Sequence, residues 1–420
     1  LISFDFSSYT QQRDAEGRRT TTTYDALHHA LTQRLPGDTE RTITTVYSIH
    51  GDLQSQTDPR DNTTTHTYDT FGRRALTTYP DVDGTIATKR ATYDKVGNVL
   101  TETNGRGQAT TYTVNALNQR ETQTDPATPD GQYEQRWTYD AIGNALTHVD
   151  RRGVLSVTAY DKENRAIGHA RDGRILDTLT RDAEGNVTLL RDALGRETHT
   201  VYDKANRKTV ETGPLQATST WTYTAEGDIA TATDADGRTT SYTYTNRRYQ
   251  ESATLAGETT TNTYNGSGQL IERQRPNGKT WAYAYDPEGR LKTVTDPLDP
   301  ATTYGYDVSN NRTSIKDANN RTTTFAYDAR NRLGGKTYPG GASTVWKYDA
   351  DGNQTSIDTP NGRTIATTYD ALNRALTTTY SGAAANEASR TTRHYDGNAN
   401  VVAVEESIGN VTRAETRRYD

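Results

Sequence analysis

Polar and apolar residues alternate with period two in short stretches that recur along the whole chain. The stretch Arg196–Tyr202, which reads R-E-T-H-T-V-Y, is an example. Such alternation is typical of β-strands, and Gly, Asp, Asn and Pro residues separate the stretches as turn formers do. We therefore predict an all-β chain of strand–turn–strand–turn units, with antiparallel strands of about five to eight residues.

These units form a repeat of about 21 residues, and a Tyr-Asp pair marks the start of most copies. The intervals that differ from 21 are of 20, 23, 24, 25 and 26 residues, and only Val114 and Arg181 replace the Tyr. No linker or change of composition interrupts the repeat, so we predict one continuous array over residues 1–420. The starts are Tyr24, Tyr47, Tyr68, Tyr93, Val114, Tyr139, Tyr160, Arg181, Tyr202, Tyr223, Tyr244, Tyr264, Tyr285, Tyr306, Tyr327, Tyr348, Tyr369, Tyr395 and Tyr419.

The fourth residue after each start is Gly or Asn in nearly every repeat, with His28, Arg248 and Ala399 as exceptions. Gly and Asn share a tolerance of positive φ, which indicates a tight turn. The Asp after the Tyr can accept backbone N–H groups of the same turn. The predicted turn residues are Gly51, Gly72, Gly97, Asn118, Gly143, Asn164, Gly185, Asn206, Gly227, Gly268, Gly289, Asn310, Asn331, Gly352 and Asn373.

A second turn is predicted seven residues before many starts. Extra residues in the longer intervals should enlarge a turn, as in Asp81-Val82-Asp83-Gly84, and leave the strand register unchanged. The residues that mark this second turn are Gly107, Gly153, Gly195, Gly237, Gly257, Gly278, Asn320, Gly341 and Gly362.

The residue two before the start lies on the same strand face as the Tyr and is often aromatic. We expect these rings to align in ladders along one face, where aromatic cross-strand neighbours add about 0.2–1 kcal/mol per pair. Binding of sugars or unfolded polypeptide is a second interpretation of the ladder. The ladder residues are Tyr112, Trp137, Trp221, Tyr242, Tyr283, Tyr304, Phe325 and Trp346.

Composition favours an extended or hollow β architecture over a solid core. Hydrophobic residues make up 31% of the chain, against about 45–50% in typical domains, whereas 77 Thr, 33 Gly and 27 Tyr are present. This aromatic and β-branched content argues against disorder. A sheet of so many repeats is too long to stay flat, so we expect it to coil into a hollow shell or tube.

The sequence offers no candidate catalytic, cofactor-binding or metal-binding residue. One Asp per repeat supplies too few oxygens for calcium, so we favour turn capping for these residues. The chain has no Cys and no Gly-x-Ser-x-Gly motif, and its eight His are scattered, with His28 and His29 in a turn. Mixed charges with a net charge of -6 argue against nucleic-acid binding, and no apolar run approaches the length of a membrane span.

The repeats resemble the Rhs/YD-repeat family, whose motif is Tyr-Asp-x-x-Gly-Arg. Residues Tyr68–Arg73 and Tyr285–Arg290 match the motif fully, and Tyr93–Asn98 and Tyr139–Asn144 match it with Asn in the last position. The resemblance implies a spiral of β-hairpins that forms a hollow shell, which in bacterial toxins encloses a separate C-terminal toxin domain. The self-cleaving segment that ends the family's core is absent, and Asp296–Pro300 reads as an ordinary second turn.

The resemblance leads to a non-catalytic scaffold as the leading hypothesis, a section of shell around a toxin cargo. A structural filament or tube, and an adhesin that binds a protein or glycan partner, are the alternatives. The expected partners are an encapsulated polypeptide or neighbouring repeats, with no nucleic acid and no cofactor. The expected location is outside a bacterial cell, secreted or on its surface. Because the sequence contains no Met, even at position 1, we expect a processed product or an internal part of a longer chain.

Overall fold

The computed structural model describes residues 8–37, 41–382, 389–408 and 411–419. These residues contain 38 β-strands of five to eight residues and no helix, so the prediction of an all-β chain of short antiparallel strands is confirmed. No helix long and apolar enough to cross a membrane occurs in these ranges.

Contacts divide the chain into two compact units. Unit 1 comprises Leu1–Glu134, Ala284–Thr295 and Asp299–Asp420, and unit 2 comprises Gln135–Tyr283 and Asp296–Leu298. The hairpin repeat continues through both units, and the expectation of one array over residues 1–420 stays a prediction. Unit 1 contains two strips of sheet, which we call the first strip (β1–β11) and the second strip (β27–β38).

Within each strip every strand pairs antiparallel with the next strand of the chain. The first strip consists of β1 (Ser8–Arg13), β2 (Arg19–Tyr24), β3 (Ala30–Arg34), β4 (Thr42–Tyr47), β5 (Leu53–Thr57), β6 (Thr63–Tyr68), β7 (Arg74–Thr78), β8 (Thr88–Tyr93), β9 (Val99–Thr103), β10 (Ala109–Val114) and β11 (Arg120–Thr124). The second strip consists of β27 (Leu291–Thr295), β28 (Thr302–Tyr306), β29 (Arg312–Lys316), β30 (Thr322–Tyr327), β31 (Leu333–Thr337), β32 (Ser343–Tyr348), β33 (Gln354–Asp358), β34 (Arg363–Tyr369), β35 (Ala375–Gly382), β36 (Ser389–Tyr395), β37 (Val401–Ile408) and β38 (Val411–Thr416).

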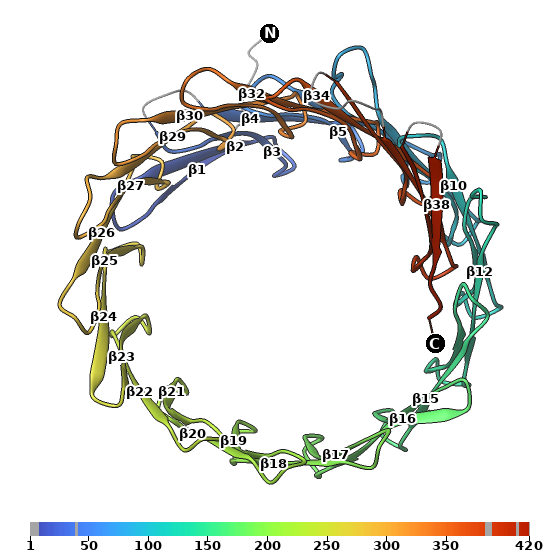
Figure 1. The fold of residues 1–420 in the computed structure, drawn as a ribbon, viewed down its shortest axis with the longest axis horizontal. Coiled ribbons are helices and arrows are strands. Elements are labelled where there is room, and N and C mark those ends of the chain that lie inside the picture. Colours follow the sequence, from blue (N-terminus) through green and yellow to red (C-terminus); the bar gives the residue numbers. More distant parts are fainter. Residues whose placement is uncertain (1–7, 38–40, 383–388, 409–410, 420) are drawn as a thin grey trace. The chain divides into compact units, whose positions relative to one another are not determined.

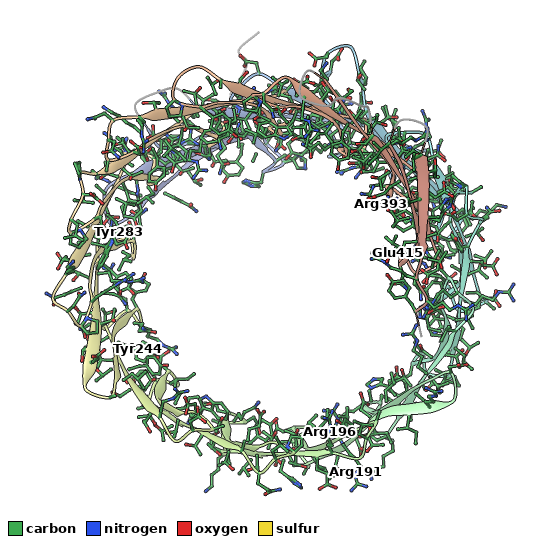
Figure 2. The ribbon with its side chains drawn as sticks, in the orientation of Figure 1. Arg191, Arg196, Tyr244, Tyr283, Arg393 and Glu415 are labelled. Carbon is green, nitrogen blue, oxygen red and sulfur yellow. The ribbon has the colours of Figure 1, made fainter. Side chains whose placement is uncertain are left out.

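Unit 2 is a single strip that runs from β12 to β26. Figure 1 shows this strip as a curved ribbon, and in Figure 2 Tyr244 lies at its concave side and Arg191 at its convex side. Its strands are β12 (Glu134–Tyr139), β13 (Ala145–Val149), β14 (Leu155–Tyr160), β15 (Ala166–Arg171), β16 (Arg174–Arg181), β17 (Val187–Asp192), β18 (Glu197–Tyr202), β19 (Lys208–Thr212), β20 (Thr218–Tyr223), β21 (Ile229–Thr233), β22 (Thr239–Tyr244), β23 (Gln250–Leu255), β24 (Glu258–Tyr264), β25 (Leu270–Gln274) and β26 (Thr280–Tyr285).

Two kinds of turn alternate along each strip. We call the turn that follows the motif Tyr the YD turn, and the turn at the other edge of the strip the return turn. In the YD turn Asp203–Arg207, the Asp203 N–H donates to the Arg207 carbonyl (2.9 Å) and the Asn206 N–H to the Asp203 carbonyl (3.0 Å). The return turn Asp192–Arg196 has the same two bonds at 3.0 and 2.9 Å. The register also shifts by a β-bulge at Tyr202, which lies before the YD turn and increases the local twist.

Extra residues of a long repeat enlarge the return turn, as predicted. The loop around Asp81–Gly84 closes on itself through the Val82–Thr85 bridge, and Thr78 and Thr88 on either side remain paired. The prediction for Asp81–Gly84 is therefore confirmed. The longest interval, from Tyr369 to Tyr395, includes residues 383–388, which lie outside the described residues.

The sheet has almost no conventional core. Ala87 and Tyr395 are the buried hydrophobic residues among those described. Thr side chains instead bond to each other across neighbouring strands, for example Thr92 with Thr101 (2.6 Å) and Thr222 with Thr231 (2.6 Å). A sheet exposed on both faces gains more from such side-chain ladders than from aliphatic burial, which explains the many Thr residues.

Candidate functional site

The Asp of each YD turn caps its own turn. In the turn Asp203–Arg207, one carboxylate oxygen accepts the N–H groups of Ala205 (2.8 Å) and Arg207 (3.0 Å), and the other accepts Arg207 Nε (2.8 Å). The Arg207 side chain and its backbone N–H lower the pKa of Asp203 below its usual value. Turn capping, the interpretation preferred over calcium binding, thus has direct geometric support.

Acid should unfold the array, because many of these Asp residues share a lowered pKa. Hydrogen bonds to the carboxylates lower the pKa of Asp69, Asp182 and Asp203 below the ordinary value of 3.8. A pKa that is lower in the folded state adds stability above the unfolded pKa, and this stability is lost as the pH falls through the folded pKa. We expect the thermal unfolding midpoint to stay level down to about pH 5 and to drop below about pH 4. A midpoint unchanged at about pH 3 would contradict this.

The residue four after each start adopts positive φ in every predicted position. The values range from 59° at Asn206 and Asn331 to 105° at Gly97. The three exceptions His28, Arg248 and Ala399 also lie at 64°, 65° and 67°. The turn therefore imposes this conformation even on residues that tolerate it poorly.

Gly352→Val should destabilise its repeat by about 1–2 kcal/mol, because a β-branched residue clashes at φ 92°. Gly352→Asn should be nearly neutral, since Asn adopts positive φ at this position in other repeats, as at Asn331 (59°), and a Cβ atom there would meet only Arg332 Nη1, at 4.0 Å. Hydrogen exchange should increase around residues 348–357 in the Val variant and leave distant repeats protected. Equal behaviour of the two variants would refute the turn assignment.

The motif Tyr fastens each repeat to the one before it. The Tyr202 hydroxyl donates to the Val187 carbonyl (3.2 Å), and Tyr348 donates in the same way to Leu333 (2.8 Å). Arg181, which replaces the Tyr in one repeat, donates Nε and Nη2 to the equivalent carbonyl of Ala166 at 3.2 and 3.0 Å. Arg181 therefore replaces the Tyr hydroxyl as the donor in its repeat, whereas Val114 has no donor to form this bond.

Tyr348→Phe should cost about 1 kcal/mol, because it removes one hydrogen bond and leaves the ring in place. Arg181→Tyr should leave the stability close to that of the original protein, since both side chains donate to the same carbonyl. Urea unfolding followed by near-UV circular dichroism measures both changes. A Phe variant as stable as the original would show that the hydroxyl contributes nothing.

The last residue of one YD turn also contacts the next YD turn, and two pairings recur. An Asn in this place donates to the Asn four after the next start, whereas an Arg stacks over the next Tyr ring. Arg332 lies 4.7 Å from the Tyr348 ring centre and donates to the Asp349 carbonyl (3.0 Å). The YD turn that it contacts has Gly352 in place of an Asn. The Asn pairs are Asn98–Asn118 (2.8 Å), Asn144–Asn164 (3.3 Å), Asn186–Asn206 (2.9 Å), Asn311–Asn331 (2.8 Å) and Asn353–Asn373 (2.7 Å). Asn at the turn thus supplies an acceptor that Gly lacks, in addition to tolerating positive φ.

The ladder residues are all half-buried on the Tyr face, but their cross-strand partners are not aromatic rings, apart from the imidazole of His148. Trp137 stacks on His148 with ring centres 4.9 Å apart. Burial and a hydrogen bond to Glu102 (2.6 Å) raise the pKa of Tyr112 to about 12. The expectation of aromatic cross-strand pairs is wrong here, because the rings lie on every second strand and the paired strands carry no Phe, Tyr or Trp. The described partners are Tyr112–Gln123, Trp137–His148, Trp221–Ala232, Tyr242–Ala253, Tyr304–Ile315, Phe325–Lys336 and Trp346–Ile357.

In unit 1, return turns of the first strip dock on YD turns of the second strip, and we call this contact the seam. Figure 1 shows β4 and β5 beside β32 and β34. Arg60 donates to the carbonyls of Tyr327 (2.9 Å) and Asp328 (2.9 Å) and to Asn331 Oδ1 (2.9 Å).

Arg106 repeats this contact two repeats further along the seam. It donates to the carbonyls of Tyr369 (2.8 Å) and Asp370 (2.7 Å) and to Asn373 Oδ1 (3.0 Å). The partners of Arg60 and Arg106 lie 263 to 271 residues away in the sequence. The chain therefore returns against itself after about twelve or thirteen repeats.

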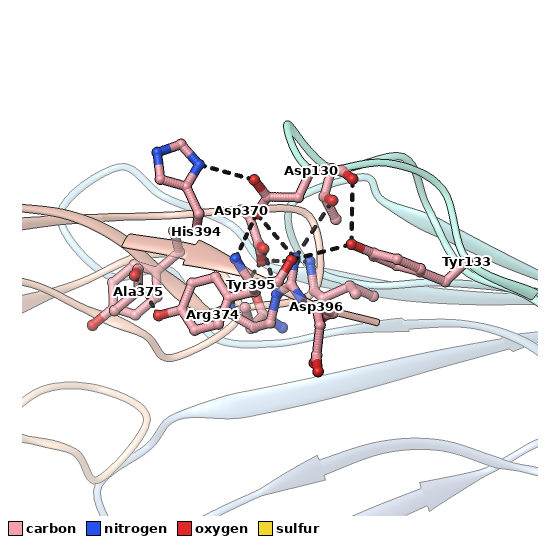
Figure 3. Close-up of polar contacts among 12 residues, drawn as sticks. Asp130, Tyr133, Asp370, Arg374, Ala375, His394, Tyr395 and Asp396 are labelled. Atoms are coloured by element: carbon pink, nitrogen blue, oxygen red, sulfur yellow. Dashed lines mark hydrogen bonds and ion pairs between the residues drawn. The ribbon is translucent and has the colours of Figure 1, made fainter. Parts of the chain in front are cut away.

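A buried cluster of charges continues the seam (Figure 3). Asp130, in the enlarged return turn after β11, accepts bonds from His394 Nδ1 (3.1 Å) and the Tyr395 N–H (3.0 Å). Arg374 lies 3.8 Å from Asp130 and forms a 2.6 Å ion pair with Asp370, whose side chain is 0% exposed. The guanidinium also stacks over the Tyr395 ring at 4.6 Å.

Sequence reasoning missed the seam. Its signal in the sequence is slight, an Arg in the third position of the return turns Asp58–Asn62 and Asn104–Gln108. Partners more than 260 residues away cannot be identified from one repeat. Among the described residues, no group of three or more His, Asp or Glu forms a candidate metal site.

Comparisons with known proteins agree with the repeat and the fold. The family model described as RHS Repeat matches residues 47–81, 264–301, 285–321, 306–343 and 348–385. The search of curated proteins found no match.

The fold is similar to three solved structures. "TcdB2-TccC3 without hypervariable C-terminal region" matches with a TM-score of 0.73 and 15% identity, covering 97% of this chain and 26% of that one. "TcdB2-TccC3" matches with a TM-score of 0.58 and 16% identity (98% and 30% covered), and "TcdB2-TccC3-Cdc42" with 0.51 and 15% (95% and 30%). This chain thus spans about a quarter of the length of the first solved chain. The chain thus contains RHS repeats in the matched segments, and its fold is similar to that of these structures.

Proposed function

We propose that the chain is a non-catalytic section of wall in a secreted bacterial protein, where it encloses a polypeptide toxin cargo. The seam of unit 1 is the observation that carries this proposal. A strip that returns against itself and is held edge to edge by Arg60 and Arg106 gains a wall wider than one hairpin. Such a wall can separate a cargo from solvent, which a single open strip cannot do.

The chemistry of the wall supports a passive role. The residues that recur at fixed positions of the repeat form structural bonds. The Asp caps a turn, the Tyr fastens two repeats, and the Arg or Asn joins adjacent turns. The half-buried ladder rings would stabilise the wall and line one of its faces. The proposal of an enclosed cargo rests on the resemblance to the Rhs/YD-repeat family.

Limited proteolysis of the protein expressed from its complete gene tests the proposal. We expect sequence enclosed by the repeats to resist protease and to become cleavable when Arg60→Ala and Arg106→Ala open the seam. Equal cleavage in both proteins would contradict enclosure. Long polymers in electron micrographs would favour a filament instead, and retention on a glycan array would favour an adhesin.

A further inference from the structure

The seam reveals the complete set of acceptors that a YD turn offers to an incoming Arg. For Arg106 these are the Tyr369 and Asp370 carbonyls and the Asn373 side-chain oxygen. The Asp of the preceding YD turn adds a carboxylate, Asp349, 3.6 Å from Arg106 Nε. The Asn353 amide also donates to Asn373 Oδ1 (2.7 Å), which orients that oxygen.

Arg60 uses the equivalent atoms of its own site. Asp307, in the YD turn before the one that Arg60 contacts, lies 3.8 Å from its Nε. Asn311 donates to Asn331 Oδ1 (2.8 Å), as Asn353 does to Asn373. Both sites therefore combine an Asp and an Asn in one YD turn with an Asn four after the start of the next.

Two YD turns of unit 2 reproduce this set. Asn206 Oδ1 accepts the Asn186 amide at 2.9 Å, and Asp182 supplies the preceding carboxylate. Asn164 is held in the same way by Asn144 (3.3 Å), which follows Asp140. Among the described contacts, no guanidinium reaches the side-chain oxygen of either Asn.

The turn tips of these two sites are also uncovered. Lys162 and Lys204, which lie two after the motif Tyr, are exposed, whereas Ala329 in the docked turn is half-buried. Lys162 forms an exposed ion pair with Glu163 (3.6 Å). The edge of the strip at Asn164 and Asn206 therefore has room for a second edge.

The spacing of these sites matches that of the seam. Asn331 and Asn373 are 42 residues apart, which is two repeats, and so are Asn164 and Asn206. A further copy of the set lies at Asn118, held by Asn98 (2.8 Å), in the first strip of unit 1. A docking partner must therefore present Arg residues at an interval of two repeats.

We propose that Asn164 and Asn206, with Asp140 and Asp182, form vacant arginine-docking sites for the return turns of another RHS-repeat strip. This partner is argued from the seam, where the same acceptors bind an Arg in the third position of a return turn. The hydrogen bond from Asn186 and the turn N–H groups lower the pKa of Asp182, so its carboxylate is charged at neutral pH. The docking is therefore complementary in charge as well as in geometry.

Disulfide trapping tests the proposal cleanly, because the chain has no Cys. In the seam, Asn62 of the return turn and Ala329 of the YD turn line one cavity of about 220 Å³. The probe is a backbone-cyclised hairpin peptide of residues 53–68 with Asn62→Cys. The protein carries Lys204→Cys, which is the counterpart of Ala329 at the Asn206 site.

We expect about tenfold more capture of this peptide than of the same peptide with Arg60→Ala, as loss of a charge-assisted hydrogen bond would give. Asn206→Gly, which keeps the positive φ, should remove this preference. Ala225→Cys provides the matched control, because its YD turn has Gly227 where the proposed site has Asn206. The YD turn before it ends in Arg207, where the proposed site has Asn186. Circular dichroism confirms that each variant is folded.

Equal capture of the two peptides at Cys-substituted position 204 would overturn the proposal. An equal preference at position 225 would do the same, because that turn lacks the Asn oxygen. Equal capture of a linear Arg-containing thiol peptide would overturn the choice of a strip edge as the partner.

Discussion

Asp370→Asn should lower the free energy of unfolding of unit 1 by about 3 kcal/mol or more, because it leaves the Arg374 charge buried without its main partner. The two side chains are 0% and 8% exposed and form a 2.6 Å ion pair. Asp130 compensates little, since it lies 3.8 Å from Arg374 and already accepts bonds from His394 and Tyr395. Urea unfolding monitored by tryptophan fluorescence gives the change.

Asp203→Asn is the matched control for this prediction. Asp203 and Arg207 form the same turn pair at 2.6 Å, but their side chains are 24% and 33% exposed. Water solvates the remaining charge, so the cost should stay below about 1 kcal/mol. Equal losses at the two positions would mean that burial in the seam adds nothing.

The double variant Arg60→Ala, Arg106→Ala should separate the two strips of unit 1. Each substitution removes three hydrogen bonds that a charged guanidinium donates. A hydrogen bond of this kind contributes about 1.5–3 kcal/mol to stability. The hairpins themselves should survive, because their backbone bonds are local. Hydrogen exchange should therefore increase at the YD turns of Asp328 and Asp370 and remain slow in the neighbouring strands.

Arg196→Ala with Arg238→Ala is the control for the seam. These Arg residues also belong to return turns, but each forms an exposed ion pair with an Asp of its own turn. Their loss should change exchange only within those turns. Protection at Asp328 and Asp370 that survives the Arg60 and Arg106 substitutions would show that other contacts hold the seam.

Two residues show how much of the turn was predictable. Asn206 was identified as a positive-φ residue from its register with Gly in other repeats, and its φ is 59°. That it also accepts a hydrogen bond from Asn186 was not predicted, because the register alone does not show which turns are adjacent in space. The sequence does contain the signal, since each Asn at the end of a YD turn from Asn98 to Asn353 is followed by an Asn in the next turn.

The aromatic ladder shows where pattern reasoning failed. Parity along one strand correctly placed Trp221 and Tyr223 on one face, both half-buried. The residue opposite Trp221 is Ala232, because the paired strand Ile229–Thr233 contains no aromatic residue. Parity along one strand determines the face of a ring, whereas its neighbour across the sheet depends on the residues of the paired strand.

By itself the sequence determined the hairpin repeat, because strand alternation, positive φ and Asp capping all act within a few residues. Tertiary structure alone decided which edges meet. Arg60 and Arg106 contact residues more than 260 positions away. Each is the third residue of its return turn, and Leu194 has the same place in an exposed return turn. The difference arises because twist, added over many repeats, sets which YD turn faces each return turn.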